Sequence, residues 1–329
     1  MGKDAQGLST AFITNDTRAG AFLRRLFFFR PMIKRFQEQH AGILPVLALF
    51  LATFFWGSSF LTISATLEYT NPLTLMMMRF SIGAIFVGLM LGRGVTRIPK
   101  STWRAGAICG VVIYAAYSTN AIGLMTIESS MSGFLTALYV PLTPLLLWFV
   151  YGRTPSIGAF AGAMLAFVGL IFLANPFTLT FANNTGEWVT ILSAFISAGE
   201  IIIVGKYAPG TQARQLAFTQ LVSVAVIATV GVGLASLTGL PLKETTLNST
   251  VLTGAVWLAV IVAFVQVLLS WAQRYVPAGR AAVIFAMESV FAAVLGWFAG
   301  ENLGLTGLFG GILIVSGILL GELRLTKKK

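Results

Sequence analysis

The chain has 329 residues, of which 10% are charged and 57% are hydrophobic, and its formal net charge is +11. Soluble domains carry about a quarter of their residues as charged types. This composition, with a mean hydropathy of +0.85, therefore excludes water as the main solvent of the chain. The basic residues are spread over six separate segments instead of one face, so we expect no nucleic-acid partner.

The first 42 residues precede any apolar span. Residues 1–20 are polar, and residues 21–36 interleave Arg and Lys with Phe and Leu, a pattern typical of a segment that lies on a membrane surface. A basic flank that only sets the orientation of the chain is the alternative. We predict a cytoplasmic tail over residues 1–42 whose basic amphipathic part contacts membrane lipid.

Ten apolar spans follow, and each is long enough to cross a hydrocarbon core of roughly 30 Å. All should be helices, because an open strand edge could not satisfy its backbone hydrogen bonds in lipid. The sequence thus predicts an all-α integral membrane protein with ten transmembrane helices. The predicted helices cover residues 44–66, 72–92, 103–123, 131–151, 155–174, 188–206, 213–236, 251–271, 279–299 and 304–323.

The basic residues fall almost entirely in alternate connections between these spans. The connections that lie between the basic ones hold a single basic residue, Lys243. Cytoplasmic loops carry an excess of Lys and Arg, so the pattern requires an even number of crossings with both termini inside.

An internal repeat links the two halves of the chain. A shift of 148 residues places the segment that starts at Leu138 over the segment that starts at Ala286 without a gap, and it places Gly162 on Gly310. Five spans per half is an odd number, so the second copy must insert upside down relative to the first. Inverted repeats are frequent in secondary transporters, with the binding site near the midplane. The predicted parts are a first repeat over 43–174, an external linker over 175–187, a second repeat over 188–323 and a basic tail over 324–329.

The stretch FFWGSSFLTISATLEYTNPLTLMMMRFSIGAI, which starts at Phe54, resembles the opening of the EamA domain of the drug/metabolite transporter superfamily. It shares a Trp-Gly-Ser start, a Pro after the first span and an Arg inside the second. The segments that end in Gly152-Arg153 and Gly300-Glu301 resemble the closing part of that domain.

The resemblance covers about residues 45–323 as two EamA copies. It implies a cavity wrapped by helices 1 to 4 and 6 to 9, with helices 5 and 10 packed behind. It also implies a transporter for a small organic metabolite, an amino acid or related compound, with export more often than import. We expect the protein in the cytoplasmic membrane of a bacterium.

Three charged side chains lie well away from the ends of the predicted spans, namely Arg79, Glu200 and Glu288. A charge at the bilayer centre costs roughly 2.5 to 3.5 kcal/mol on insertion scales, so each one requires a reason. Glu288 is a candidate for binding a substrate cation or accepting a coupling proton. The alternative is a structural ion pair with Arg79 that holds the two halves in register. A structural role is preferred for Arg79 and Glu200, and both stay in the candidate set.

Uncharged polar and aromatic side chains form a second set of candidates. Small-molecule cavities combine apolar walls with a few polar groups, whereas hydrogen bonding between helices is the alternative explanation. The candidates are Tyr114, Tyr117 and Asn120 in helix 3, Gln266 in helix 8, Trp56 in helix 1 and Tyr139 in helix 4. The prolines of helix 4, Pro141 and Pro144, should bend it.

Glycines in helices 5 and 10 have small-xxx-small spacing, which predicts close packing within one subunit or between two. A homodimer through these helices is therefore open. They include Gly158, Gly162, Gly169, Gly310, Gly317 and Gly321.

Several signatures of other functions are missing from the sequence. There is no GxxxxGK[ST] loop for ATP, and the one histidine, His40, precedes the first span, so we expect no cofactor and no metal site. An intramembrane enzyme would need clustered nucleophiles, and a channel would need a repeated filter segment. The sequence shows neither feature. A secondary transporter is the preferred interpretation, and a membrane partner or sensor that does not transport stays open.

Overall fold

The computed structural model describes residues 43–127, 129–152, 156–173, 185–238, 242–298 and 304–322. The predicted N-terminal tail, residues 175–184 of the predicted external linker, the basic C-terminal tail, Arg153 and Glu301 lie outside the described residues. The last three residues of that linker, 185–187, belong instead to the helix that starts at Thr185.

Every regular element in these ranges is helical. Nine helical segments of the described chain are long and apolar enough to cross a membrane, and α8 is a shorter apolar helix. Because these ten segments coincide with the ten predicted spans, the predicted all-α, ten-helix membrane fold is confirmed. The segments are α3 (Ile43–Leu67), α4 (Pro72–Leu91), α5 (Lys100–Gly123), the pair α6 (Ser129–Thr136) and α7 (Tyr139–Tyr151), α8 (Ile157–Leu173), α9 (Thr185–Tyr207), α10 (Ala213–Thr238), α11 (Ser249–Ala272), the pair α12 (Ala278–Phe285) and α13 (Met287–Phe298), and α14 (Gly304–Glu322).

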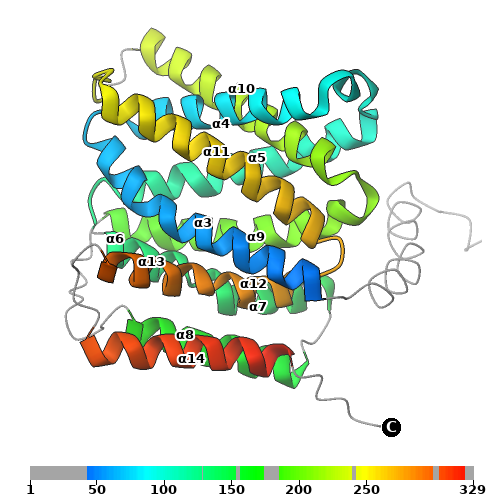
Figure 1. The fold of residues 1–329 in the computed structure, drawn as a ribbon, viewed down its shortest axis with the longest axis vertical. Helices are drawn as coiled ribbons and strands as arrows, with labels where there is room; N and C mark the ends of the chain where they lie inside the picture. Colours follow the sequence, from blue (N-terminus) through cyan, green and yellow to red (C-terminus); the bar gives the residue numbers. More distant parts are fainter. Residues whose placement is uncertain are drawn as a thin grey trace, which may run out of the picture. The chain divides into compact units, whose positions relative to one another are not determined.

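Successive segments run back and forth across the bundle. As a result α3 and α9, which open the two repeats, run in opposite directions, as predicted for an inverted duplication (Figure 1). The start of α3 and the end of α14 lie at the same end of the bundle. Short 3₁₀ turns, η1 (Gly92–Arg97) and η2 (Ala208–Gly210), follow the second helix and the sixth helix at that end.

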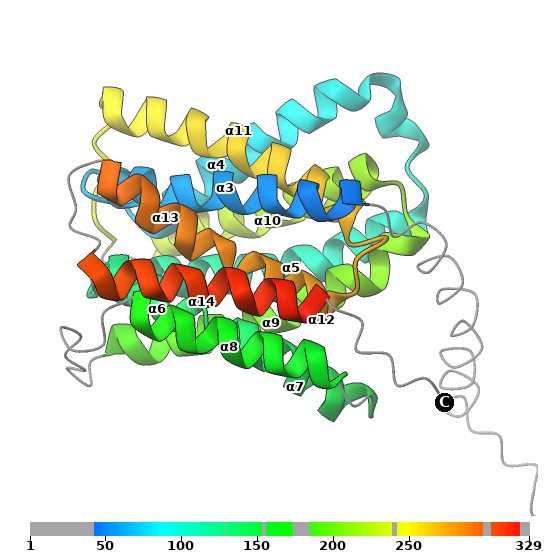
Figure 2. The same cartoon turned by 60° about the horizontal axis from the view of Figure 1, so that its bottom comes forward.

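Helices α8 and α14 lie side by side along one edge of the bundle in both views (Figures 1 and 2). A Cβ on Gly162 would lie 2.5 Å from the carbonyl oxygen of Gly317, and one on Gly169 would lie 2.6 Å from that of Gly310. Larger side chains would therefore separate the two helices, so the glycine spacing explains packing within one chain. A homodimer, which stays a prediction, would have to use other faces of these helices.

Two of the ten segments are broken near the middle of the bundle. The first break is at Ala137 and Leu138 and the second is at Ala286, the residue that the internal repeat aligns with Leu138. Leu138 has φ −55° and ψ −21°, and Ala286 has φ −56° and ψ −21°. Both N–H groups bond three residues back, at 3.3 and 3.2 Å, which tightens the chain to a 3₁₀ turn. The two copies thus share one backbone irregularity.

The first break has a direct cause in the sequence. Pro141 has no N–H to donate to the carbonyl of Ala137, and the N–H of Val140 donates to that carbonyl instead, at 3.0 Å. The bend that was predicted from the prolines of helix 4 is located here, before Pro141.

The loop before α11 is joined to the loop between α3 and α4. The ammonium of Lys243 donates to the carbonyls of Leu67 and Glu68 at 3.1 and 2.7 Å, and so caps the carboxyl end of α3. The side-chain amide of Asn71 donates to the carbonyl of Lys243 at 2.9 Å, while its oxygen caps α4. Lys243, the single basic residue in the connections that are poor in Lys and Arg, therefore connects the two repeats at this end.

Candidate functional site

A cavity of about 100 Å³ lies inside the helix bundle. Its lining residues come from α3, α4, α5, α6, α7, α9, α11, α12 and α13, and none of those described belongs to α8, α10 or α14. The predicted helices 5 and 10, which are α8 and α14, pack behind the cavity. The predicted helix 7, which is α10, was placed on the cavity wall by the resemblance, but it packs against α4 and α5. The walls thus combine segments from both repeats.

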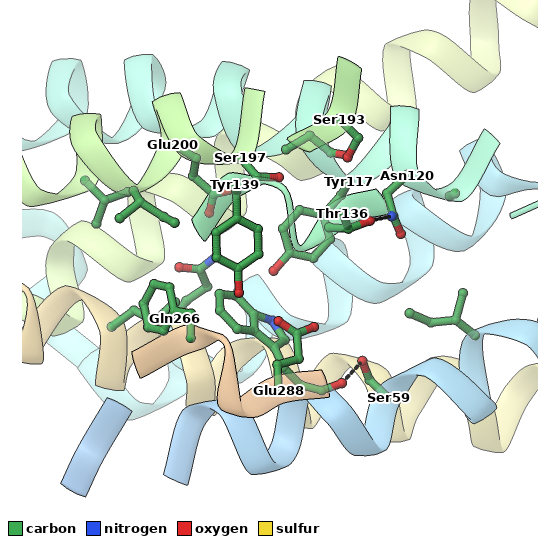
Figure 3. A pocket seen from close by; sticks show the side chains of 18 of the residues that line it. Ser59, Tyr117, Asn120, Thr136, Tyr139, Ser193, Ser197, Glu200, Gln266 and Glu288 are labelled. Atoms are coloured by element: carbon green, nitrogen blue, oxygen red, sulfur yellow. Dashed lines mark hydrogen bonds between the residues drawn. The ribbon is translucent and has the colours of Figure 1, made fainter. Parts of the chain in front are cut away.

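All three ionisable side chains that were predicted inside the spans line this cavity. Arg79 is 1% exposed and Glu200 is 7% exposed, while Glu288 is half-buried. Figure 3 shows Glu200 on the α9 wall and Glu288 on the opposite wall, with the rings of Tyr117 and Tyr139 projecting between them. The cavity therefore holds two carboxyl groups and one guanidinium among apolar and neutral polar side chains.

The guanidinium of Arg79 has no hydrogen-bond partner in the described structure, at Nε, Nη1 or Nη2. Its Cζ lies 5.2 Å from the ring centroid of Tyr117 and 5.7 Å from that of Phe80, so aromatic rings flank the cation. The ion pair between Arg79 and Glu288, considered above as a structural alternative, is not formed.

A close approach between α3 and α13 fixes the position of Glu288. A Cβ on Gly57 would lie only 2.7 Å from the carbonyl oxygen of Glu288, so the two backbones touch at this point. On the same turn of α3, Trp56 lines the cavity and packs edge-on against Phe285, with the ring centroids 5.5 Å apart. The Trp-Gly-Ser sequence at 56–58 therefore supplies an aromatic wall and the space for α13.

Neutral polar side chains connect the cavity walls or face the cavity without a partner. Asn120 donates from Nδ2 to Oγ1 of Thr136 at 2.7 Å, which ties α5 to α6 (Figure 3). Ser193 donates to the carbonyl of Ala116 at 3.0 Å, which ties α9 to α5. By contrast, both side-chain amide atoms of Gln266 lack a partner, although this residue is 1% exposed. A buried polar group of this kind is one that a ligand can satisfy.

Eight of the nine predicted site residues line the cavity, and Tyr114 does not. Its hydroxyl oxygen would lie 3.3 Å from a Cβ on Gly231, which places the tyrosine against α10. Helix 3 thus presents Tyr117 and Asn120 to the cavity, and Tyr114 one turn away toward a neighbouring helix.

The sequence interpretation missed Ser193 and Ser197, which line the cavity on α9. These serines and Glu200 are spaced i, i+4 and i+7, so they share one face of the helix. That spacing, read outward from the buried acid, was the signal that could have identified them. No group of three or more His, Cys, Asp or Glu side chains in the described ranges could hold a metal ion.

Comparisons with known proteins agree with this architecture. The EamA-like transporter family matches residues 43–175 and 184–321, once over each set of five helices. An uncharacterized transporter of Archaeoglobus fulgidus is 25% identical over 335 residues, which cover 98% of this chain and all of that protein.

A protein of known crystal structure has a similar fold. The superposition has a TM-score of 0.68 and covers 84% of this chain and 95% of that one, at 19% sequence identity. With the family match spanning both halves of the membrane domain, the chain belongs to the EamA-like transporter family, within the drug/metabolite transporter superfamily, and is a multi-pass membrane transporter.

Proposed function

We propose that this transporter is a secondary carrier that moves a small organic metabolite, an amino acid or related compound, by alternating access. One observation carries the proposal: a single cavity is enclosed by segments from both inverted repeats, and each repeat contributes one helix that is broken beside it. Alternating access requires a site that two symmetry-related halves can open in turn to opposite sides.

The equal backbone conformations at Leu138 and Ala286 support the same mechanism. Each break separates a half-helix from its continuation, so each repeat has a point at which one half can tilt without breaking a long helix. Because the copies are inverted, tilting at one break opens the cavity to one side and tilting at the other opens it to the opposite side. The rocking of one repeat against the other needs no further moving part.

Glu288 is the residue that we propose binds the cationic group of the cargo or a coupling proton. It is the second residue after the break in helix 9 and faces the cavity, so movement at the break changes its surroundings (Figure 3). Glu200 is the second candidate for coupling. We further propose that both termini are cytoplasmic, in the cytoplasmic membrane, and that transport runs toward the outside, in keeping with the charge bias and the family resemblance.

Flux through liposomes tests the carrier proposal. The purified full chain should give saturable exchange of at least one compound from a broad pool of small metabolites. Glu288→Gln should abolish that flux while the protein stays folded, because the amide cannot carry the charge. Glu244→Gln, a change at an exposed loop residue, is the matched control and should transport normally. Normal flux through Glu288→Gln would remove the role of this residue, and the absence of saturable flux through the wild type would refute the carrier.

A further inference from the structure

The position of Arg79 poses a physical problem that the protein itself does not solve. Its guanidinium is almost completely removed from solvent, yet none of its three nitrogen atoms has a hydrogen-bond partner in the described structure. A buried charge without a partner is strongly unfavourable, and such groups are normally paired with an opposite charge. Glu288 is near enough to interact with this cation electrostatically, but no anion of the described protein is hydrogen-bonded to it, so the N–H groups of Arg79 are left for an anion from outside the protein.

The cavity that Arg79 lines is a space that such an anion can enter. Arg79 lines it together with Gln266, whose two amide atoms also lack partners. The Tyr117 ring, 5.2 Å from Cζ, restricts the guanidinium on one side. A planar guanidinium held against a ring presents a fixed fork of N–H groups, and that fork matches the two oxygens of a carboxylate.

The acidic side chains that share the cavity with Arg79 limit the kind of anion. Glu200 and Glu288 line the same cavity, so a phosphate with two negative charges would meet two carboxyl groups. A carboxylate carries a single charge and is repelled less. If the same molecule also carries an ammonium group, that group can approach Glu288 while the carboxylate approaches Arg79. A zwitterion therefore has a group for Arg79 and a group of opposite charge for Glu288.

We propose that Arg79 binds the carboxylate of a zwitterionic cargo, with Glu288 facing its amine. The inference rests on the proposed carrier function and adds to it the residue that recognises the anionic end of the cargo. It assigns Arg79 a binding role, in place of the structural role that the sequence favoured.

Thermal unfolding of the full chain in detergent tests the assignment with matched probes. The probes are neutral α-amino acids, the α-amides of the same compounds, which lack the carboxylate, and their N-acetyl derivatives, which lack the amine. At least one amino acid should raise the unfolding midpoint of the wild type, and its amide and N-acetyl derivative should not. Equal stabilisation by acid and amide, or no stabilisation by any amino acid, would overturn the proposal.

The variant Arg79→Met separates binding from structure. Removing an unpaired buried charge should leave the midpoint of the ligand-free protein unchanged or raise it, because an apolar side chain replaces a desolvated cation. The shift caused by the amino acid should disappear, with a loss of apparent affinity of about tenfold or more. Arg79→Lys keeps the charge without the fork and should bind with intermediate affinity. Arg97→Met, at an exposed arginine of η1, is the control and should behave as wild type.

The outcomes distinguish this inference from the carrier proposal. If Arg79→Met fails to fold, or unfolds at a much lower midpoint and still responds to the amino acid as wild type does, Arg79 is structural and the inference is wrong. If Arg79→Met exchanges amino acids in liposomes with the KM of the wild type, the inference about Arg79 is wrong, while the carrier proposal stands. A wild-type binding shift without any saturable flux would instead refute the carrier and leave the binding site standing.

Discussion

The contact between Gly57 and α13 predicts that a single added methyl group will disturb the site. In Gly57→Ala, the new Cβ would lie 2.7 Å from the carbonyl oxygen of Glu288 and 3.0 Å from the backbone nitrogen of Ala292. Both neighbours are backbone atoms, so no side-chain rotation can relieve the contact. The change must be absorbed by separating α3 from α13.

The size of the separation follows from the same distances. Ordinary contact of a Cβ begins at 3.4 Å, so α13 has to retreat by roughly 0.7 Å, and Glu288 moves with it. Added methyl groups in close-packed interiors typically cost about 1 to 3 kcal/mol. We expect Gly57→Ala to lower the free energy of unfolding by that amount and to reduce the flux, because the carboxyl group is displaced from the cavity wall.

Thermal unfolding and liposome flux, measured on the same preparation, check this prediction. Gly233→Ala is the control, because a Cβ at Gly233 in α10 would meet nothing within 4 Å. This control should lose neither stability nor flux, since replacing a helical Gly by Ala usually favours the helix. If Gly57→Ala unfolds and transports as wild type does, the close contact between α3 and α13 is not a constraint on the site and the reasoning is refuted.

Two further predictions concern contacts away from the cavity. Gly162→Ala would place a Cβ 2.5 Å from the carbonyl oxygen of Gly317, so it should cost about 1 to 3 kcal/mol in unfolding while the KM for transport stays unchanged; an altered KM at normal stability would contradict this. Lys243→Ala removes both hydrogen bonds to the end of α3, so amide exchange should accelerate at residues 67–71 and not at the 3₁₀ turns of the opposite end. Unchanged exchange at 67–71 would show that the bonds do not hold the loops together.

Most of the membrane fold could be predicted from the sequence, because the bilayer imposes a length and a composition on each span. Local signals also fixed some boundaries. Asn71-Pro72 has a capping side chain followed by a residue that favours the first helical turn, and α4 begins at Pro72. The side chain of Asn248 also caps a helix, and α11 begins at Ser249, two residues before its predicted start.

The break in helix 9 could not be predicted from local sequence. Helix 4 carries Pro141, whereas the aligned position in helix 9 is Ser289, which has an N–H to donate. That N–H bonds to the carbonyl of Ala286, three residues back, at 3.3 Å. The sequence permits an unbroken helix here, so the break depends on the surrounding packing. The internal repeat contained the clue, since it aligned Leu138 with Ala286.

The sequence predicted which residues line the cavity better than it predicted how their side chains are arranged. Charged, aromatic and amide side chains in apolar spans are few, so most of them could be identified as cavity residues from their rarity alone. Rarity gives no information on which groups touch. It could not show that Arg79 and Glu288 stay apart, nor that Tyr114 packs against α10, because the rotation of each helix about its axis depends on its neighbours.

The positions at which the two repeats differ explain why this cavity can recognise an asymmetric molecule. Two identical inverted copies would give a cavity with two-fold symmetry, in which every charge is met by an equal one. Arg79 is the eighth residue of α4, and the eighth residue of its counterpart α10 is the neutral Gln220. Glu288 in the second repeat aligns with Val140 in the first. The cation therefore comes from one copy and this carboxyl group from the other, so the cavity carries unlike charges from the two copies, although the backbone has the same conformation at the break in each copy.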